Sequence, residues 1–134
     1  MSAADLRILF VFIDGFGIGE PDPAVNPLFA GEYPALQRVV TEGKPIDACL
    51  GVDGLPQSAT GQAALLTGVN VPDAVGGHQP GFPGPTVRAI VEEHNIFRRL
   101  LATGRSCTFA NAYHLDGLTP AEIRRRQSVT TVAT

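Results

Sequence analysis

Cysteine, methionine and tryptophan are scarce in this 134-residue chain, which has two cysteines, one methionine and no tryptophan. Cys49 and Cys107 lie far apart and form no C-x-x-C pair, so the sequence indicates neither a zinc clip nor a disulfide framework. We therefore expect a reducing, cytoplasmic setting. The only early apolar run, from Ile8 to Ile13, is closed by Asp14 and is too short for a targeting signal or a membrane span. The sequence predicts a soluble protein with no membrane partner.

Basic side chains are few over most of the chain. The formal net charge is −3, and residues 1–97 carry eleven acidic but only four basic side chains. This balance argues against nucleic acid as a partner. The basic run Arg124–Arg126 is typical of a solvated helix face. Hydrophobic residues make up 44% of the sequence, so a packed core is feasible despite fifteen glycines and eleven prolines.

Apolar and glycine-punctuated segments alternate in a way that predicts an α/β fold. Arg7–Ile13 is apolar on both alternating faces, as in a strand buried between two helical layers. Two more strands are predicted at 46–52 and 106–112. Helical patterns with glycine stops or a capping sequence occupy the segments between and after them, namely 35–41, the region 55–68, 86–93, 96–101 and a start at Thr119–Glu122.

The predicted architecture is a partial three-layer α/β sandwich with a mostly parallel sheet. Residues 1–134 would form the N-terminal part of a longer domain, because the segment 128–134 begins a further element and then stops. The segment 69–85 holds four glycines and four prolines with no periodicity, which indicates a surface loop near a functional site.

Asp14 is the most informative acidic residue. It follows the apolar strand directly and precedes Gly15, which places its carboxylate where open α/β sheets bind ligands. A carboxylate in that place suits magnesium, manganese or zinc. The alternative is an aspartate that only caps its own turn. The glycines do not form a dinucleotide-binding motif, since Glu20 stands where the third glycine of G-x-G-x-x-G would be, and no P-loop motif is present.

Ser58 is the second informative residue, because it stands at the entry of a helix whose first turn, Ala59-Thr60-Gly61, has little side-chain bulk. The unpaired N–H groups and the dipole of such a helix favour a phosphate, and a hydroxyl there can be a nucleophile. The local sequence is not G-x-S-x-G, so activation would have to come from a metal ion. In the alternative interpretation, Ser58 or Thr60 only caps the helix.

Two motifs, Phe12-Ile-Asp-Gly-Phe-Gly17 and Gln57-Ser-Ala-Thr-Gly-Gln-Ala-Ala-Leu-Leu-Thr-Gly68, resemble those of the alkaline phosphatase-like metalloenzymes, which include cofactor-independent phosphoglycerate mutase and phosphopentomutase. The resemblance implies that Asp14 binds metal and that Ser58, which also contacts metal, is transiently phosphorylated. Gln62 and Thr60 are then candidate contacts of a phosphorylated small-molecule substrate. His78 is a further candidate contact from the 69–85 loop, and the alternative is a solvated loop histidine. Two divalent ions, Mn, Mg or Zn, would serve a phosphomonoesterase or phosphomutase reaction. The likeness is loose outside these two motifs.

The sequence departs from that family in its metal ligands. Full-length members supply further Asp and His ligands from a later part of the chain, and none of His78, His94 and His114 forms a pair that reproduces them. The resemblance thus implies an N-terminal portion that is inactive alone. Two other hypotheses remain: one half of a split metalloenzyme, completed by a C-terminal polypeptide, and a non-catalytic α/β binding module.

Overall fold

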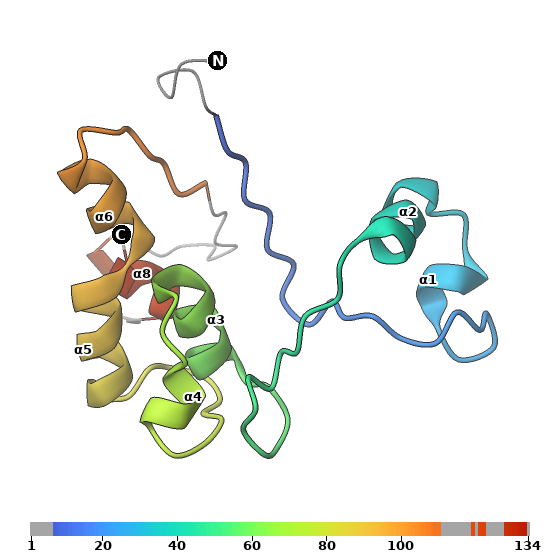
Figure 1. The fold of residues 1–134 in the computed structure, drawn as a ribbon, viewed down its shortest axis with the longest axis horizontal. Coiled ribbons are helices and arrows are strands. Elements are labelled where there is room, and N and C mark those ends of the chain that lie inside the picture. Colours follow the sequence, from blue (N-terminus) through green and yellow to red (C-terminus); the bar gives the residue numbers. More distant parts are fainter. Residues whose placement is uncertain (1–6, 111–118, 120, 123–127, 134) are drawn as a thin grey trace. The chain divides into compact units, whose positions relative to one another are not determined.

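The computed structural model describes residues 7–110, 119, 121–122 and 128–133, and every regular element among them is an α-helix (Figure 1). The predicted α/β fold is therefore wrong for the described residues, which contain no strand and hence no parallel sheet. The chain divides into two compact units, Met1–Ile46 and Asp47–Thr134. Each unit is described by itself below.

The first unit holds two short helices, α1 (Pro27–Ala30) and α2 (Pro34–Glu42), each of which begins with a proline. Proline suits this position because the first helical N–H has no partner within the helix. The Gln37 side-chain amide joins the two helices by donating to the carbonyl oxygens of Leu28, at 2.8 Å, and Gly31, at 3.1 Å. The predicted helix 35–41 with its stop at Gly43 is confirmed.

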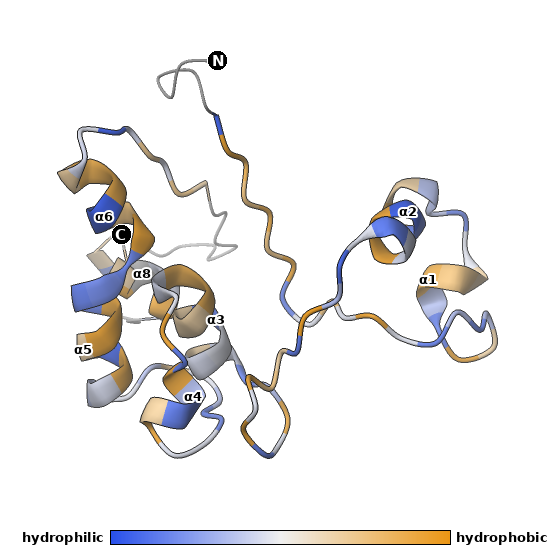
Figure 2. Ribbon diagram, in the orientation of Figure 1, coloured by the Kyte–Doolittle hydropathy of each residue, from blue (hydrophilic) through white to orange (hydrophobic). Residues whose placement is uncertain are grey.

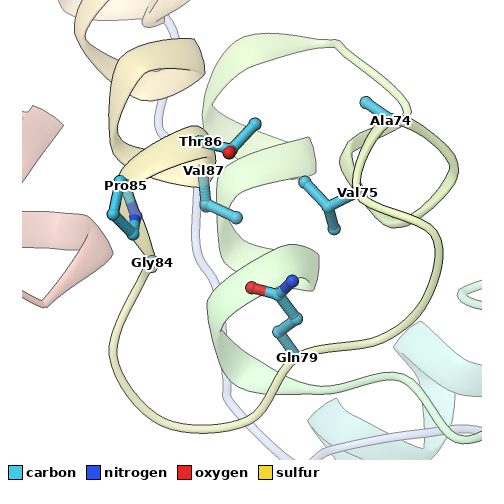
Figure 3. Close-up of a pocket in the computed structure, with 7 residues that line it drawn as sticks. All are labelled: Ala74, Val75, Gln79, Gly84, Pro85, Thr86 and Val87. Atoms are coloured by element: carbon cyan, nitrogen blue, oxygen red, sulfur yellow. The ribbon is translucent and has the colours of Figure 1, made fainter.

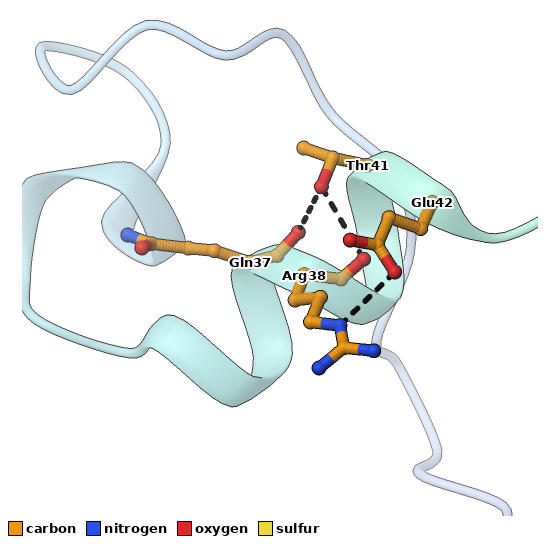
Figure 4. A network of polar contacts seen from close by, with 4 residues as sticks. All are labelled: Gln37, Arg38, Thr41 and Glu42. Atoms are coloured by element: carbon orange, nitrogen blue, oxygen red, sulfur yellow. Dashed lines mark hydrogen bonds and ion pairs between the residues drawn. The ribbon is translucent and has the colours of Figure 1, made fainter.

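Apart from the Gln37 side chain, the polar contacts drawn on α2 join residues within one helical turn (Figure 4). The Arg38 guanidinium meets the Glu42 carboxylate at 3.0 Å, and the Thr41 hydroxyl donates to the Gln37 carbonyl oxygen at 2.9 Å. Both partners of the ion pair are exposed, so the pair contributes little to stability. This helix is therefore anchored mainly through Gln37.

The predicted strand Arg7–Ile13 is an exposed extended segment of the first unit, coloured apolar in Figure 2 after its basic first residue. No described residue forms a strand ladder with it. A strand gains its hydrogen bonds from another segment, so an apolar pattern alone does not produce one.

The second unit is a small helical assembly built from α3 (Ser58–Thr67), α4 (Val71–Ala74), α5 (Pro85–His94), α6 (Ile96–Ala102) and α8 (Val129–Ala133). Helix α3 contacts α4 and α5, and α8 contacts both α3 and α5 (Figure 1). These contacts bury a common cluster: Ala63, Leu66, Val71, Val87, Val91, Val129 and Ala133. The apolar faces of the helices cover one another here, where the predicted architecture had a sheet.

Helix boundaries in this unit follow local sequence signals. Gly68 ends α3 with φ +74°, in the left-handed region that favours glycine. Asn95 is fully buried and begins α6, where its side chain accepts from the Arg98 N–H at 2.9 Å and donates to the Val91 carbonyl oxygen at 2.9 Å. At Thr119 the predicted capping sequence is confirmed, because the Glu122 carboxylate accepts from the Thr119 N–H at 2.7 Å.

The other two predicted strands are also corrected. Residues 46–52 contain turns centred on Asp47, whose carboxylate accepts from the N–H groups of Cys49 and Gly51. These short-range bonds satisfy the backbone locally, in place of a ladder with another segment. Residues 106–110 form no regular element, and 111–112 lie outside the described residues, as does His114. Helix α8 is the element that the sequence predicted to begin near residue 128.

Candidate functional site

Ser58 is the first residue of α3, and it follows Gln57, whose extended backbone leads into the helix without a side-chain cap. The serine is half-buried, and no described residue hydrogen-bonds its hydroxyl. Around Gly61 there is open space, since an added Cβ would meet no atom within 4 Å. The predicted helix entry with little side-chain bulk is confirmed, and it leaves a hydroxyl near the positive end of the helix dipole.

Thr60 is fully buried and ties α3 to the loop that leads to α5. Its hydroxyl accepts from the Gln79 N–H at 3.1 Å, and the Gln79 carbonyl oxygen accepts from the Ala59 N–H at 3.1 Å. This pair of bonds closes one side of the first helical turn. Gln62 is half-buried one helical turn after Ser58, and it also takes part in an interaction with another residue.

His78 is half-buried beside the turn that follows Asp47. Its Nε2 lies 3.2 Å from the Val52 carbonyl oxygen, and an added Cβ on Gly54 would lie 3.4 Å from its ring. A carbonyl oxygen only accepts, so Nε2 is the donor in this contact. Nδ1 is buried and has no hydrogen-bond partner among the described residues. The contact with Val52 thus links this turn to the loop that contains His78 and Gln79, and Gln79 bonds α3.

Backbone hydrogen bonds favour the charged form of the Asp47 carboxylate. The N–H groups of Cys49 and Gly51, at 2.8 and 3.0 Å, lower the pKa of Asp47, and the charge of His78 adds a smaller effect in the same direction. Hydrogen bonds to the charged form of a carboxyl favour that form. The sequence predicted a strand at 46–52 instead of this turn, although aspartate favours turns because its side chain can accept from the N–H two residues further on.

A hollow of about 350 Å³ lies beside the start of α5, lined by Ala74, Val75, Gln79, Gly84, Pro85, Thr86 and Val87 (Figure 3). Figure 3 shows the Gln79 amide and the Thr86 hydroxyl as its polar side-chain groups. Gln79 therefore has two roles, because its backbone bonds α3 and its side chain lines the hollow. No sequence signal identified this residue.

Asp14 lies in the first unit, in the turn Ile13–Phe16. The Phe16 N–H donates to the Ile13 carbonyl oxygen at 3.2 Å, and Gly15 adopts φ +72°. The predicted glycine turn is confirmed, and Asp14 is exposed in it. The second unit contains the other candidates, Ser58, Thr60, Gln62 and His78. The sheet edge that was expected to bring Asp14 and Ser58 together does not exist among the described residues.

The sequence also predicted that Asp14 and Ser58 contact a metal ion. Within residues 7–110 and the shorter described stretches, no three His, Cys, Asp or Glu side chains form a group that could hold a metal ion. None of the helices in the same ranges is long and apolar enough to cross a membrane. No family model, curated protein or solved structure matches this chain.

Proposed function

We propose that this chain takes part in metal-dependent phosphoryl transfer on a phosphorylated small molecule in the cytoplasm. Ser58 transiently accepts the phosphoryl group, and Asp14 is one ligand of a metal ion that the reaction uses. The proposal takes its chemistry from the two motifs that resemble alkaline phosphatase-like metalloenzymes. The same motifs are compatible with a phosphomonoesterase and with a phosphomutase.

The observation that carries the proposal is the place of Ser58 at the start of α3. Its hydroxyl has no hydrogen-bond partner among the described residues, and space is open beside Gly61. A phosphate there would meet the dipole of a ten-residue helix and the N–H groups of its first turn other than those of Ala59 and Gly61, which bond the carbonyl oxygens of Gln79 and Gln57. The Ser58 oxygen would then bond to phosphorus as the bond to the leaving oxygen breaks. Water or a second substrate hydroxyl would later receive the phosphoryl group.

Serine is a weak nucleophile without assistance. The described residues do not bring together enough ligands for a metal ion, so they do not account for the activation of Ser58. A metal ion would need ligands from other residues or from a second polypeptide. The phosphate site and the metal ligand can be tested separately.

The phosphate site can be tested by titrating the full chain with inorganic phosphate while recording backbone amide NMR signals. Helix α5 is an internal control, because it also has ten residues, no side-chain cap and no acidic residue in its first turn. We expect saturable shifts at Ser58–Gly61 and smaller ones at the start of α5. Equal shifts at both helices would reduce the effect to a general property of helix ends and contradict the proposal.

Two serine variants sharpen that titration. Ser58→Ala should weaken phosphate binding about tenfold, the size expected for losing one hydrogen bond to a charged group. Ser106→Ala is the matched control, because Ser106 is exposed and outside the described helices. The proposal fails if both variants bind phosphate as tightly as the original chain.

The metal ligand is tested with Mn²⁺ alone, which broadens NMR signals of nearby nuclei. The signals of residues 13–16 should broaden first, and Asp14→Asn should remove that effect. Asp22→Asn is a suitable control, because Asp22 is another exposed aspartate in a turn of the same unit, where it accepts from the Ala24 N–H. Broadening that survives Asp14→Asn would exclude Asp14 as a ligand.

A non-catalytic binding module is the second candidate, and one observation favours it. Gln79 already bonds the Ala59 N–H and the Thr60 hydroxyl, so part of the first turn of α3 is occupied from within the chain. In that case Ser58 only begins the helix. Absence of phosphate shifts at Ser58–Gly61, together with an intact fold, would support this candidate.

A further inference from the structure

The segment Ile8–Ile13 is the most exposed apolar stretch of the first unit. Its six side chains are between 46% and 87% exposed, and they are all large and hydrophobic (Figure 2). Water contact over so much contiguous apolar surface is unfavourable. A cover for this segment would remove that cost.

The backbone of the segment also makes very few hydrogen bonds to the residues that the structure describes. Among the described residues, the one backbone hydrogen bond within it is that from the Phe16 N–H to the Ile13 carbonyl oxygen. The six residues are β-branched, aromatic or leucine, and they include no glycine, proline or charge. Stretches of this length and composition pair readily as β-strands between chains. What covers the segment must supply backbone partners as well as apolar contact.

Charge at the two ends indicates which partner does so. Arg7 precedes the run and Asp14 follows it, so the segment is positive at one end and negative at the other. In an antiparallel pair of identical segments, Arg7 of each copy faces Asp14 of the other, and Phe10 faces Val11 at the centre. Such a pair is self-complementary, as a two-fold interface requires. Parallel pairing in register would place like charges opposite one another, which is unfavourable.

We infer that the segment Arg7–Asp14 pairs in antiparallel fashion with the same segment of a second copy of this chain. Each strand of the pair keeps a second unpaired edge, and both faces of the pair are apolar, so further copies add as concentration rises. The strand forms between molecules, where each copy supplies the hydrogen bonds that the other lacks. This inference does not depend on the proposed phosphoryl transfer.

Sedimentation velocity of the purified full chain over a range of concentrations tests the inference, with infrared spectroscopy to detect intermolecular β-structure. We expect oligomers that carry the β signal. Leu9→Lys should raise the concentration needed for association by about tenfold or more, because a charge must then be buried. Leu55→Lys is the matched control, since Leu55 is 78% exposed and Leu9 is 87% exposed. It should leave association unchanged.

A charge exchange tests the antiparallel arrangement. Arg7→Glu should weaken association, and adding Asp14→Arg to it should restore association, because opposite charges again face each other. Far-UV circular dichroism shows that the helices of the second unit are intact in each variant. A purified chain that stays monomeric, or a Leu55→Lys effect equal to that of Leu9→Lys, overturns the inference. Failure of the double variant to recover overturns the antiparallel register, as does an inert Arg7→Glu.

Discussion

Replacing Leu66 by alanine should destabilise the second unit far more than the same replacement at its neighbour Leu65. Both residues lie in α3, but Leu66 is 7% exposed and belongs to the core, whereas Leu65 is 43% exposed. The two substitutions change helix propensity equally, so the difference between them isolates burial.

The structure sets the size of the difference. Leucine to alanine removes three carbons, worth about 0.8 kcal/mol each when buried, and the cavity left behind adds a further cost. We expect Leu66→Ala to lower the free energy of unfolding by about 3 kcal/mol. For Leu65→Ala we expect about 1 kcal/mol, because much of that side chain is already in water and no closed cavity forms. The gap is about 2 kcal/mol, a large fraction of the stability of a small domain.

Urea unfolding followed by far-UV circular dichroism measures both values. The slope of each unfolding curve should be shared by the two variants and the original chain, so that the midpoints report stability. Equal losses at Leu65 and Leu66 would refute the helical core in which α3 packs on α5 and α8.

Three further outcomes are expected. Gly68→Ala should lower the free energy of unfolding by about 1 kcal/mol, because φ at Gly68 is +74°. Gly61→Ala should raise it by about 0.5 kcal/mol, because Gly61 lies inside α3 with open space around it. Urea unfolding measures both changes. Asn95→Ala should cost about 2 kcal/mol by removing two buried hydrogen bonds, against less for the exposed cap Asn70, again by urea unfolding. Acid should open the turn at Asp47 below pH about 3.9, the ordinary aspartate value. The pKa of Asp47 is lowered in the turn, so its carboxylate stabilises the turn above that pH and loses this effect as it becomes protonated. Amide NMR shifts recorded against pH measure the change.

For each of these three predictions, one experimental result would contradict the structure. Equal effects at the two glycines would mean that the backbone angle at the end of α3 is not the one described. An Asn95 variant as stable as the Asn70 variant would mean that its side chain is not buried between α5 and α6. Asp47→Asn should abolish the pH-dependent shifts, and a midpoint above the ordinary aspartate value would contradict the hydrogen bonds to its carboxylate.

Local signals in the sequence predicted α2, α3, α5 and α6 but not the four-residue helices α1 and α4, the second of which lies in the predicted loop 69–85. The stops at Gly43 and Gly68, the serine at the start of α3 and the capping sequence at Thr119 were all readable, because a helix closes its hydrogen bonds within a few residues. For the same reason, the turn that contains Asp14 was predicted from its glycine. The position of Ser58 at the start of a helix was thus predicted.

Contacts between distant segments were not predicted. Gln79 bonds the first turn of α3 from a loop, and Val129 joins a core with Val91, yet neither pairing has a signature in the sequence. The three predicted strands failed in the same way, since apolar alternation gives a propensity but not a partner.

The amino-acid order by itself determined where the longer helices begin and end, where the chain turns at Asp14, and which serine starts a helix. Tertiary structure decided which apolar residues are buried, that helices cover one another in the second unit, and that Ile8–Ile13 stays exposed. Helical hydrogen bonds join residues four apart and are therefore written locally. Strand pairing and core packing depend on which distant segments come into contact, and these contacts are determined by the free energy of the whole chain.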